Sequence, residues 1–242
     1  MDTLQYVICF FAAFLAGFVH GAIGLGHGMI AMAVMTLLLP YQTSIAIVSS
    51  QLLCLVIVFT WSLRRSIDWH AMVVPSIAMS VGKILGIIFL MQIKSDYLRI
   101  GLGLFLLLYS ISQLIGIKQL QIRGTPMQGA LFCFAGGLVG GLFNVAGPLA
   151  AIYFQAVYPE DVKKYAATMN FAFLPQAIIG PTIHLYYGNF RGEGVWFACL
   201  ISSIAVMISI KLGMLVLHRI NARLLRTFTY IFITVMGAVI CF

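Results

Sequence analysis

Uncharged apolar runs follow one another along the whole chain, separated by short stretches that hold the charged residues. The runs cover roughly 4–22, 28–39, 43–63, 70–92, 97–117, 126–144, 148–157, 162–187, 194–217 and 222–241. Apolar positions are continuous rather than alternating, which is typical of helices in lipid. The runs 28–39 and 148–157 are too short to cross about 30 Å of hydrocarbon, whereas the others are long enough. The pattern predicts an all-α polytopic membrane protein.

Composition agrees with this prediction and narrows the chemistry. Hydrophobic residues make up 62% of the chain and charged residues 8%, a balance that soluble domains do not show. The five cysteines lie apart within the apolar runs and form no CxxC pair, so neither a metal site nor a disulfide framework is expected. We interpret them as packing residues, with a sulfur-handling thiol as the open alternative. No cofactor is expected.

The two halves of the chain align with each other piecewise. A shift of 119 residues aligns Gly17, Gly21, Gly28, Ser49 and Gln51 with Gly136, Gly140, Gly147, Thr168 and Asn170. A shift of 127 residues aligns Gly86, Ile93, Leu98 and Arg99 with Gly213, Ile220, Leu225 and Arg226. Because polar and Leu-Arg positions match in the same order as the glycines, we predict an internal duplication. Residues 1–120 would form the first membrane repeat and 121–242 the second.

Glycine-rich segments interrupt the apolar pattern at equivalent places in the two halves. Residues 21–28 read GAIGLGHG and residues 140–148 read GGLFNVAGP, and each segment precedes a short apolar run. Non-helical backbone at membrane depth is tolerated only where it is buried or lines a cavity. Matched breaks of this kind indicate the binding site of a transporter. Each repeat is therefore expected to contain a Gly-broken re-entrant or short helix, and the breaks are expected to meet at the site.

Basic residues give the expected orientation. If residues 1 and 40 lie on the same face, one side collects Arg64, Arg65, Lys118, Arg123, Lys163, Lys164, Arg219, Arg223 and Arg226, and the other side holds Lys94, Arg99 and Arg191. The alternative, a full first crossing followed by a returning half-helix, divides them nearly evenly. The positive-inside rule favours the first arrangement, in which both termini lie outside and the two repeats are inverted. The net charge of +8 thus reports topology rather than nucleic-acid binding.

The candidate substrate site begins with the two breaks. A half-helix that starts inside the membrane directs free N–H groups and the positive end of its dipole into the cavity. Two such ends would make an anion cradle from Gly24, Gly26, His27, Gly28, Asn144, Gly147 and Pro148. The competing interpretation is that these glycines only permit close helix crossing.

Polar residues within the apolar runs extend this candidate site. Lys83 lies deep in the run 70–92, while all six carboxylates lie in loops or at run ends. A bound anion would supply its counter-charge, although snorkelling or bonding to backbone carbonyls is the alternative. Gln51 and Asn170, which the repeat aligns, would offer amide donors to the cavity or else bridge helices.

Together the motifs 21–28 and 140–148 and the loop Ile67-Asp68-Trp69 resemble the TauE/SafE family of sulfite and organosulfonate exporters. The resemblance covers essentially the whole chain. It implies a duplicated helical carrier that moves small sulfur-containing anions, commonly outwards, across the inner membrane. The chain departs from the family pattern at His27, which interrupts a usual glycine triplet, and at Ala146, which replaces a usual glycine. The family proline shortly after His27 is also absent.

We therefore expect a secondary transporter of sulfite, thiosulfate or an organosulfonate, working as an exporter by alternating access in the inner (plasma) membrane. The alternatives are an anion channel, an intramembrane enzyme or a membrane assembly protein. No HExxH motif and no P-loop is present, so an enzyme is not expected and an ATP-driven pump is disfavoured. The expected partners are a small anionic substrate and the lipid bilayer. A homodimer is left open, and no nucleic acid is expected.

Overall fold

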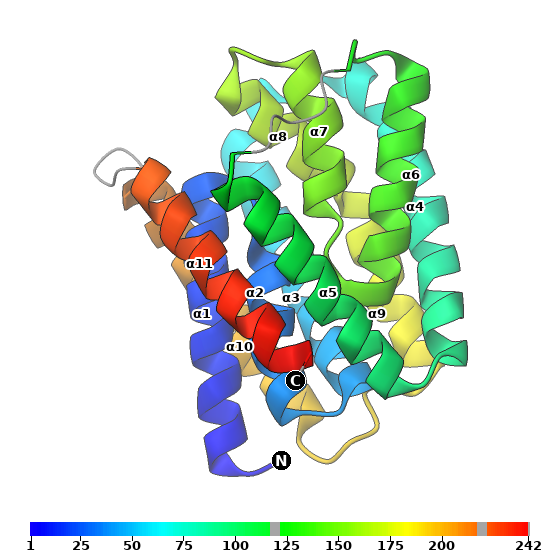
Figure 1. Ribbon diagram of the computed structural model, residues 1–242, viewed down its shortest axis with the longest axis vertical. Coiled ribbons are helices and arrows are strands. Elements are labelled where there is room, and N and C mark those ends of the chain that lie inside the picture. Colours follow the sequence, from blue (N-terminus) through cyan, green and yellow to red (C-terminus); the bar gives the residue numbers. More distant parts are fainter. Residues whose placement is uncertain (117–121, 217–221, 242) are drawn as a thin grey trace.

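A computed structural model describes residues 1–116, 122–216 and 222–241, and these residues form helices and no strands (Figure 1). The helices are α1 (Thr3–Ile23), α2 (His27–Leu38), α3 (Tyr41–Leu63), the 3₁₀ turn η1 (Arg64–Ser66), α4 (Trp69–Gln92), α5 (Ser95–Leu114), α6 (Pro126–Phe143), α7 (Gly147–Val157), α8 (Val162–Ala172), α9 (Leu174–Tyr186), α10 (Val195–Val216) and α11 (Ala222–Cys241). Seven helical segments of the described chain are long and apolar enough to cross a membrane. The protein is therefore a multi-pass helical membrane protein, as the apolar pattern predicts.

One predicted helix is wrong, because the run 162–187 forms two helices rather than one. The chain breaks at Phe173, which ends α8 and begins α9. Pro175 explains the break, since it has no N–H to donate to the carbonyl of Phe171 and its ring would clash with that carbonyl. The other predicted runs agree with the helices to within a few residues. Residue 117, Lys118, Arg219 and Ile220, on which parts of the prediction rest, lie outside the described residues.

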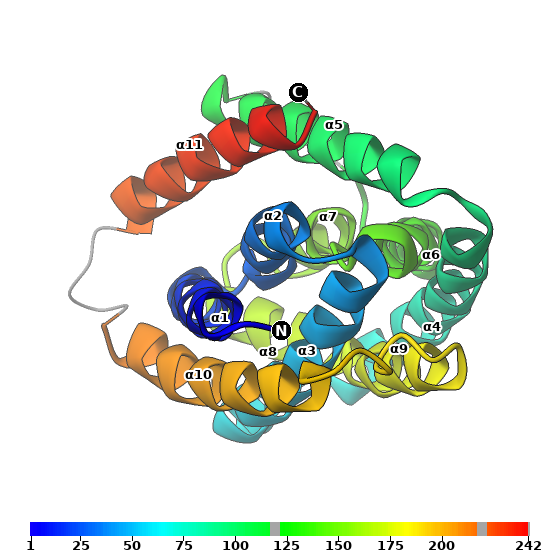
Figure 2. The same cartoon turned by 90° about the horizontal axis from the view of Figure 1, so that it is seen from below.

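The two short helices lie inside a ring of longer ones (Figure 2). Eight of the twelve residues of α2 are buried, and Met29, Ile30 and Met32 are almost fully inaccessible. An apolar helix of this kind needs protein on all sides. At 1.5 Å per residue, α2 and α7 are each only about 17 Å long, roughly half the hydrocarbon thickness. The first residue of each short helix therefore lies at mid-depth.

Long helices of the two halves pair closely across glycines. α1 runs alongside α10, and α4 alongside α6, in parallel within each pair (Figure 1). A methyl group on Gly21 would overlap the Ile210 carbonyl oxygen, and one on Gly137 would overlap the Met79 carbonyl oxygen. α5 and α11 form a third pair that runs antiparallel. Small residues thus bring backbones together where lipid offers no hydrophobic driving force for helix association.

Both termini lie toward the lower end of the molecule in Figure 1. There the Met1 amino group donates to the Glu193 carbonyl oxygen at 3.2 Å, and Arg99 donates to the Leu39 carbonyl oxygen at 3.1 Å. The upper end carries the connections from α3 to α4 and from α7 to α8. Residues 1 and 40 therefore share one end of the fold. The side chain of Arg223, like Lys118 and Arg219, is outside the described part of the structure.

Candidate functional site

The two glycine-rich breaks lie directly against each other. A methyl group on Gly28 would overlap the carbonyl oxygen of Asn144, and one on Gly147 would overlap the side chain of Leu25. The breaks come from residues more than 100 positions apart in the chain, and each starts a half-helix. The first turns of α2 and α7 therefore face one shared region in the middle of the fold.

Backbone conformation at the breaks explains which residues stand there. Gly24 ends α1 with φ 81°, and Gly26 precedes α2 with φ 115°. Both values lie in the region that glycine adopts without strain. Asn144 ends α6 with φ 57° and is the one residue other than glycine with positive φ among those described. Asparagine tolerates this conformation better than most side chains, so it can end a helix and still present an amide.

No side chain caps the N-terminus of α2 or of α7. The amides of the first turn, from His27 to Met29 and at Gly147 and Leu149, have no partner within their own helix. Pro148 lacks an N–H and stands at the position where none is needed. Two helix N-termini thus bring donors and positive dipole ends to one place, an arrangement suited to an anion.

A cavity of about 30 Å³ is lined by both breaks beside their contact, and we call it the central cavity. It has room for water. Its lining residues are His20, Leu25, Gly26, His27, Gly28, Met29, Leu52, Asn144, Val145, Ala146, Gly147, Pro148, Phe173 and Gln176. All four polar side chains of this lining are at least 96% buried. Polar groups so deep in a membrane protein are costly and usually functional.

Several polar atoms at the central cavity have no hydrogen-bond partner in the described structure. They are His20 Nδ1, His27 Nδ1 and Nε2, Asn144 Nδ2 and Gln176 Oε1. Leaving a buried polar atom unpaired costs about 1–3 kcal/mol, so such atoms are rare in native proteins unless water, an ion or a ligand completes them. Their concentration here makes the central cavity a candidate site for a polar ligand.

Lys83 stands directly behind Asn144. Its Nζ donates to Asn144 Oδ1 at 2.7 Å and to the Gly140 carbonyl oxygen at 2.6 Å, and its side chain is 1% exposed. Ser49 adds a longer contact to Asn144 Oδ1 at 3.5 Å. An ammonium group can only donate, so the amide oxygen must face Lys83 and the amide nitrogen must face away. Lys83 therefore orients the Asn144 amide so that its two N–H donors stay free for a ligand.

The two histidines have similar support from behind. Asn170 Nδ2 donates to the Ala166 carbonyl oxygen at 2.9 Å, which leaves Asn170 Oδ1 to accept from His20 Nε2 at 2.9 Å. The proton of a neutral His20 is thereby placed on Nε2, and Nδ1 remains an acceptor beside the cavity. His27 has Gln51 as its polar neighbour. Gln51 is fully buried, and its Nε2 makes a long contact of 3.9 Å with Met35 Sδ.

The structure divides the ten sequence-predicted site residues into two groups. Six of them line the central cavity: Gly26, His27, Gly28, Asn144, Gly147 and Pro148. Gln51, Lys83 and Asn170 each stand one contact behind a lining residue, and Gly24 ends α1 beside Ala166. Sequence reasoning missed Gln176, whose signal is an amide in an apolar run just after the helix-breaking Pro175.

Gln176 can present either end of its amide to the cavity. As placed, Nε2 lies 2.9 Å from Met79 Sδ and Oε1 is unpaired. A thioether is a weak acceptor, so a half-turn of the amide sacrifices little and brings the N–H donors inward. The residues described in the structure contain no group of three His, Cys, Asp or Glu side chains that could hold a metal ion.

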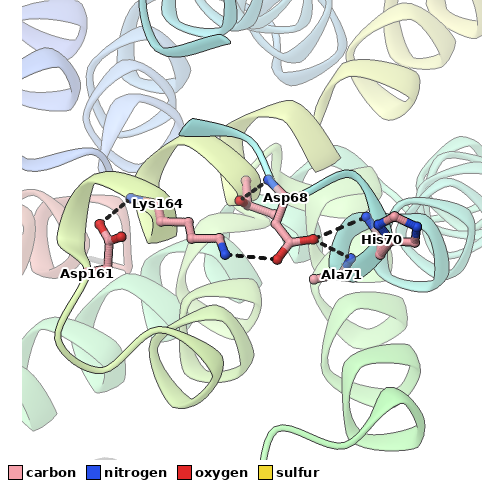
Figure 3. Close-up of polar contacts among 6 residues, drawn as sticks. Asp68, His70, Ala71, Asp161 and Lys164 are labelled. Carbon is pink, nitrogen blue, oxygen red and sulfur yellow. Dashed lines mark hydrogen bonds and ion pairs between the residues drawn. The ribbon is translucent and has the colours of Figure 1, made fainter. Parts of the chain in front are cut away.

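A second polar cluster connects the two halves at the upper end (Figure 3). Asp68 Oδ2 lies 3.1 Å from Lys164 Nζ, and Asp68 Oδ1 accepts from the amides of His70 and Ala71 at 3.2 Å. The Asp68 amide in turn donates to Thr168 Oγ1 at 3.0 Å. The Ala71 amide and then Lys164 hold the pKa of the Asp68 carboxyl down at about 2. This contact ties the start of α4 to α8.

We expect Asp68→Asn to cost less than about 1 kcal/mol, because the ion pair is partly exposed and asparagine still caps α4. A depressed carboxyl pKa stabilises the fold above the unfolded value near 4, and this contribution disappears as the pH falls through about 2. The difference in melting temperature between Asp68→Asn and the parent should therefore stay constant from pH 5 to 8. Glu160→Gln at the same end is the control, and a difference that changes within this pH range would contradict the assignment.

A family model described as sulfite exporter TauE/SafE matches residues 9–240 of the chain. The match includes both breaks, the cluster around Asp68 and every helix that contributes to the central cavity. No curated protein and no solved structure gives a significant match.

Proposed function

The chain belongs to the TauE/SafE sulfite exporter family, and from this premise we propose that it is a secondary transporter of small sulfur-containing anions. Sulfite, thiosulfate and organosulfonates are the proposed substrates. Export is the direction that the family description favours.

The observation that carries this proposal is the set of donors around the central cavity. Two uncapped helix N-termini and the Asn144 amide meet at mid-depth, and a buried ammonium group lies just behind them. No described carboxylate pairs with Lys83, since the one ion pair among the described residues is between Asp68 and Lys164. Sulfur oxyanions spread their charge over several oxygen acceptors, which matches several donors pointing into one cavity.

Inverted repeats and alternating access form the finer part of the proposal. The order of helices supports it: in each half a long helix, a buried short helix and three further crossing segments follow one another. The packing supports it as well, because α1 of the first half lies along α10 and α6 of the second half lies along α4. Rocking of residues 1–120 against 121–242 would open the central cavity to each side in turn.

The orientation proposed places the upper end of Figure 1 in the cytoplasm and both termini outside, in an inner (plasma) membrane. The described cations Arg64, Arg65, Arg123, Lys163 and Lys164 flank the connections at that end. Fewer basic residues, namely Lys94, Arg99 and Arg191, flank the opposite connections. This distribution follows the positive-inside rule.

An anion channel and an intramembrane enzyme are the competing functions. In a channel, the anion flux is not accelerated by anion on the far side of the membrane. In a carrier, the flux saturates with anion concentration and exchange accelerates it. The family is one of transporters, and the polar groups at the central cavity include no serine or cysteine nucleophile beside a base. The carrier therefore explains more of the site than either alternative.

Ligand-dependent thermal stabilisation of the detergent-purified protein tests the proposal. We expect one of sulfite, thiosulfate, sulfoacetate or taurine to raise the melting temperature saturably, while chloride and sulfate do not. A ligand at 100 times its dissociation constant adds about 2.7 kcal/mol to the stability of the folded state, which such a scan resolves. The same anion should then exchange across proteoliposome membranes, faster when it is also present on the far side.

Two results would contradict the proposal. If none of the sulfur anions raises the melting temperature, the proposed substrate class is wrong. If anion on the far side does not accelerate the flux, the protein is a channel rather than a carrier.

A further inference from the structure

A second and larger cavity lies between the α5–α11 pair and the first break, toward the upper end of the fold. Its volume is about 370 Å³, and we call it the vestibule. The polar groups around it are Tyr109, Gln113, Gln155, Tyr165, Arg226, Thr227 and Tyr230, and apolar contacts come from Ile23, Leu25 and Leu114. No Asp or Glu stands among its described lining residues. The charge of the vestibule is therefore positive.

Arg226 supplies that charge. It lies in the second turn of α11 and is exposed, and its charge interacts electrostatically with Tyr109 and Tyr165. Tyr109 and Tyr230 pack edge to face with ring centroids 6.0 Å apart. A guanidinium group can hold two oxygens of one anion at once, and tyrosine hydroxyls add further donors. This combination suits a sulfonate or sulfite group.

The vestibule leads toward the central cavity. A narrow space of about 10 Å³ shares Arg226 and Tyr230 with the vestibule and Gly26 and Met29 with the central cavity. Leu25 lines all three spaces, and its side chain lies against Gly147 of the second break. Leu25, at the tip of the first break, is thus the residue that the vestibule and the central cavity have in common.

The repeat-related arginine is placed differently. Arg99, which aligns with Arg226, is partly buried and donates to the Leu39 carbonyl oxygen at 3.1 Å near the lower end. One arginine of the aligned pair therefore faces a cavity, while the other is held by the backbone. This asymmetry is what a carrier would show when it is open toward the upper end.

We propose that the vestibule is an anion-collecting subsite, in which Arg226 captures the sulfur-containing anion before it passes Leu25 into the central cavity. This inference rests on the proposed function and adds a second binding position to it. Arg226 acts there as a binding residue for the entering anion and takes no part in holding it at the central cavity.

The charge of the vestibule can be measured without any transport. A cysteine placed by Gln113→Cys would be modified by two membrane-impermeant methanethiosulfonate reagents, one negatively and one positively charged. Adding Arg226→Gln should slow modification by the negative reagent about fivefold and speed modification by the positive one about fivefold, the factor that a unit charge near 4 Å exerts in water, so the ratio of the two rates should fall about 25-fold. Arg65→Gln, which removes the same charge from the same end, is the matched control. The chain without the added cysteine gives the background from its native thiols.

Transport kinetics test the second half of the inference. In proteoliposomes, Arg226→Gln should raise the KM for anion that enters from the vestibule side about fivefold and leave kcat unchanged. Arg65→Gln should leave both constants at their parental values. An equal KM in parent and Arg226→Gln, or a modification ratio that Arg226→Gln does not change, would overturn the subsite.

The two proposals fail separately. If the parent protein transports no sulfur anion, the proposed function fails, and the modification ratio still decides whether the vestibule attracts anions. If the parent transports while Arg226→Gln behaves like Arg65→Gln, only the subsite fails.

Discussion

Replacing Lys83 with methionine is expected to weaken anion binding about ten- to a hundredfold while the protein remains folded. The variant loses the buried positive charge and the donor that fixes the Asn144 amide at 2.7 Å. A hydrogen bond to a charged group contributes about 1.5–3 kcal/mol, and 2.7 kcal/mol corresponds to a hundredfold change in affinity. Methionine has a similar length and no charge to bury, so the packing of α4 on α6 is retained. Titration of the purified variant with the stabilising anion measures the loss.

Two substitutions at Asn144 distinguish loss of the oriented amide donors from loss of the folded protein. Asn144→Asp keeps an oxygen for Lys83 and tolerates the positive φ, but it has no N–H donors and repels the anion. Asn144→Gly keeps the backbone and removes the amide. We expect both proteins to fold and both to lose binding. Parental affinity in Lys83→Met or in Asn144→Asp would remove the Lys83–Asn144 pair from the site.

Gly28→Ala is expected to abolish transport and to lower stability by about 1–3 kcal/mol. Helix propensity alone predicts that the change raises stability, since alanine favours helix over glycine by up to about 1 kcal/mol. The tertiary contact makes the substitution destabilising instead, because the new methyl group would overlap the Asn144 carbonyl oxygen and force the two breaks apart. Melting temperature and anion exchange in proteoliposomes measure the two losses.

The matched control for Gly28→Ala is Gly101→Ala in α5. There the new methyl group would meet only the edge of the Phe143 ring, at 3.1 Å, and a ring can yield where a backbone carbonyl cannot. We expect Gly101→Ala to melt at or slightly above the parental temperature and to transport normally. A Gly28→Ala protein that transports like Gly101→Ala would show that the breaks need not touch.

The sequence predicted the helices well because each apolar run must cross or enter lipid, a constraint that acts on single segments. It missed the division at Phe173 because the run looks continuous in hydrophobicity, although Pro175 carries the signal. It also predicted that the breaks would meet, since irregular backbone at membrane depth needs protein around it.

What the sequence could not determine is which polar residue reaches the central cavity and which stands behind it. Lys83, Gln51 and Asn170 are as buried and as polar as Asn144, His27 and His20. Whether a residue lines the cavity or lies behind a lining residue depends on the rotation of each helix about its axis. It also depends on contacts between residues 60 to 150 positions apart. The Arg226 vestibule has the same origin, because it requires α5 and α11 to pair across the front of the first break.

The sequence by itself determined the membrane-spanning class, the two mid-depth breaks and the excess of basic residues at one end, because each depends on local hydrophobicity, backbone freedom or charge. Only the tertiary structure decided that Lys83 donates to Asn144, that Leu25 lines both cavities and that Arg226 lines one of them. Those features depend on which side chains meet, and helices packed through small residues have several nearly equivalent rotations until the whole assembly selects one.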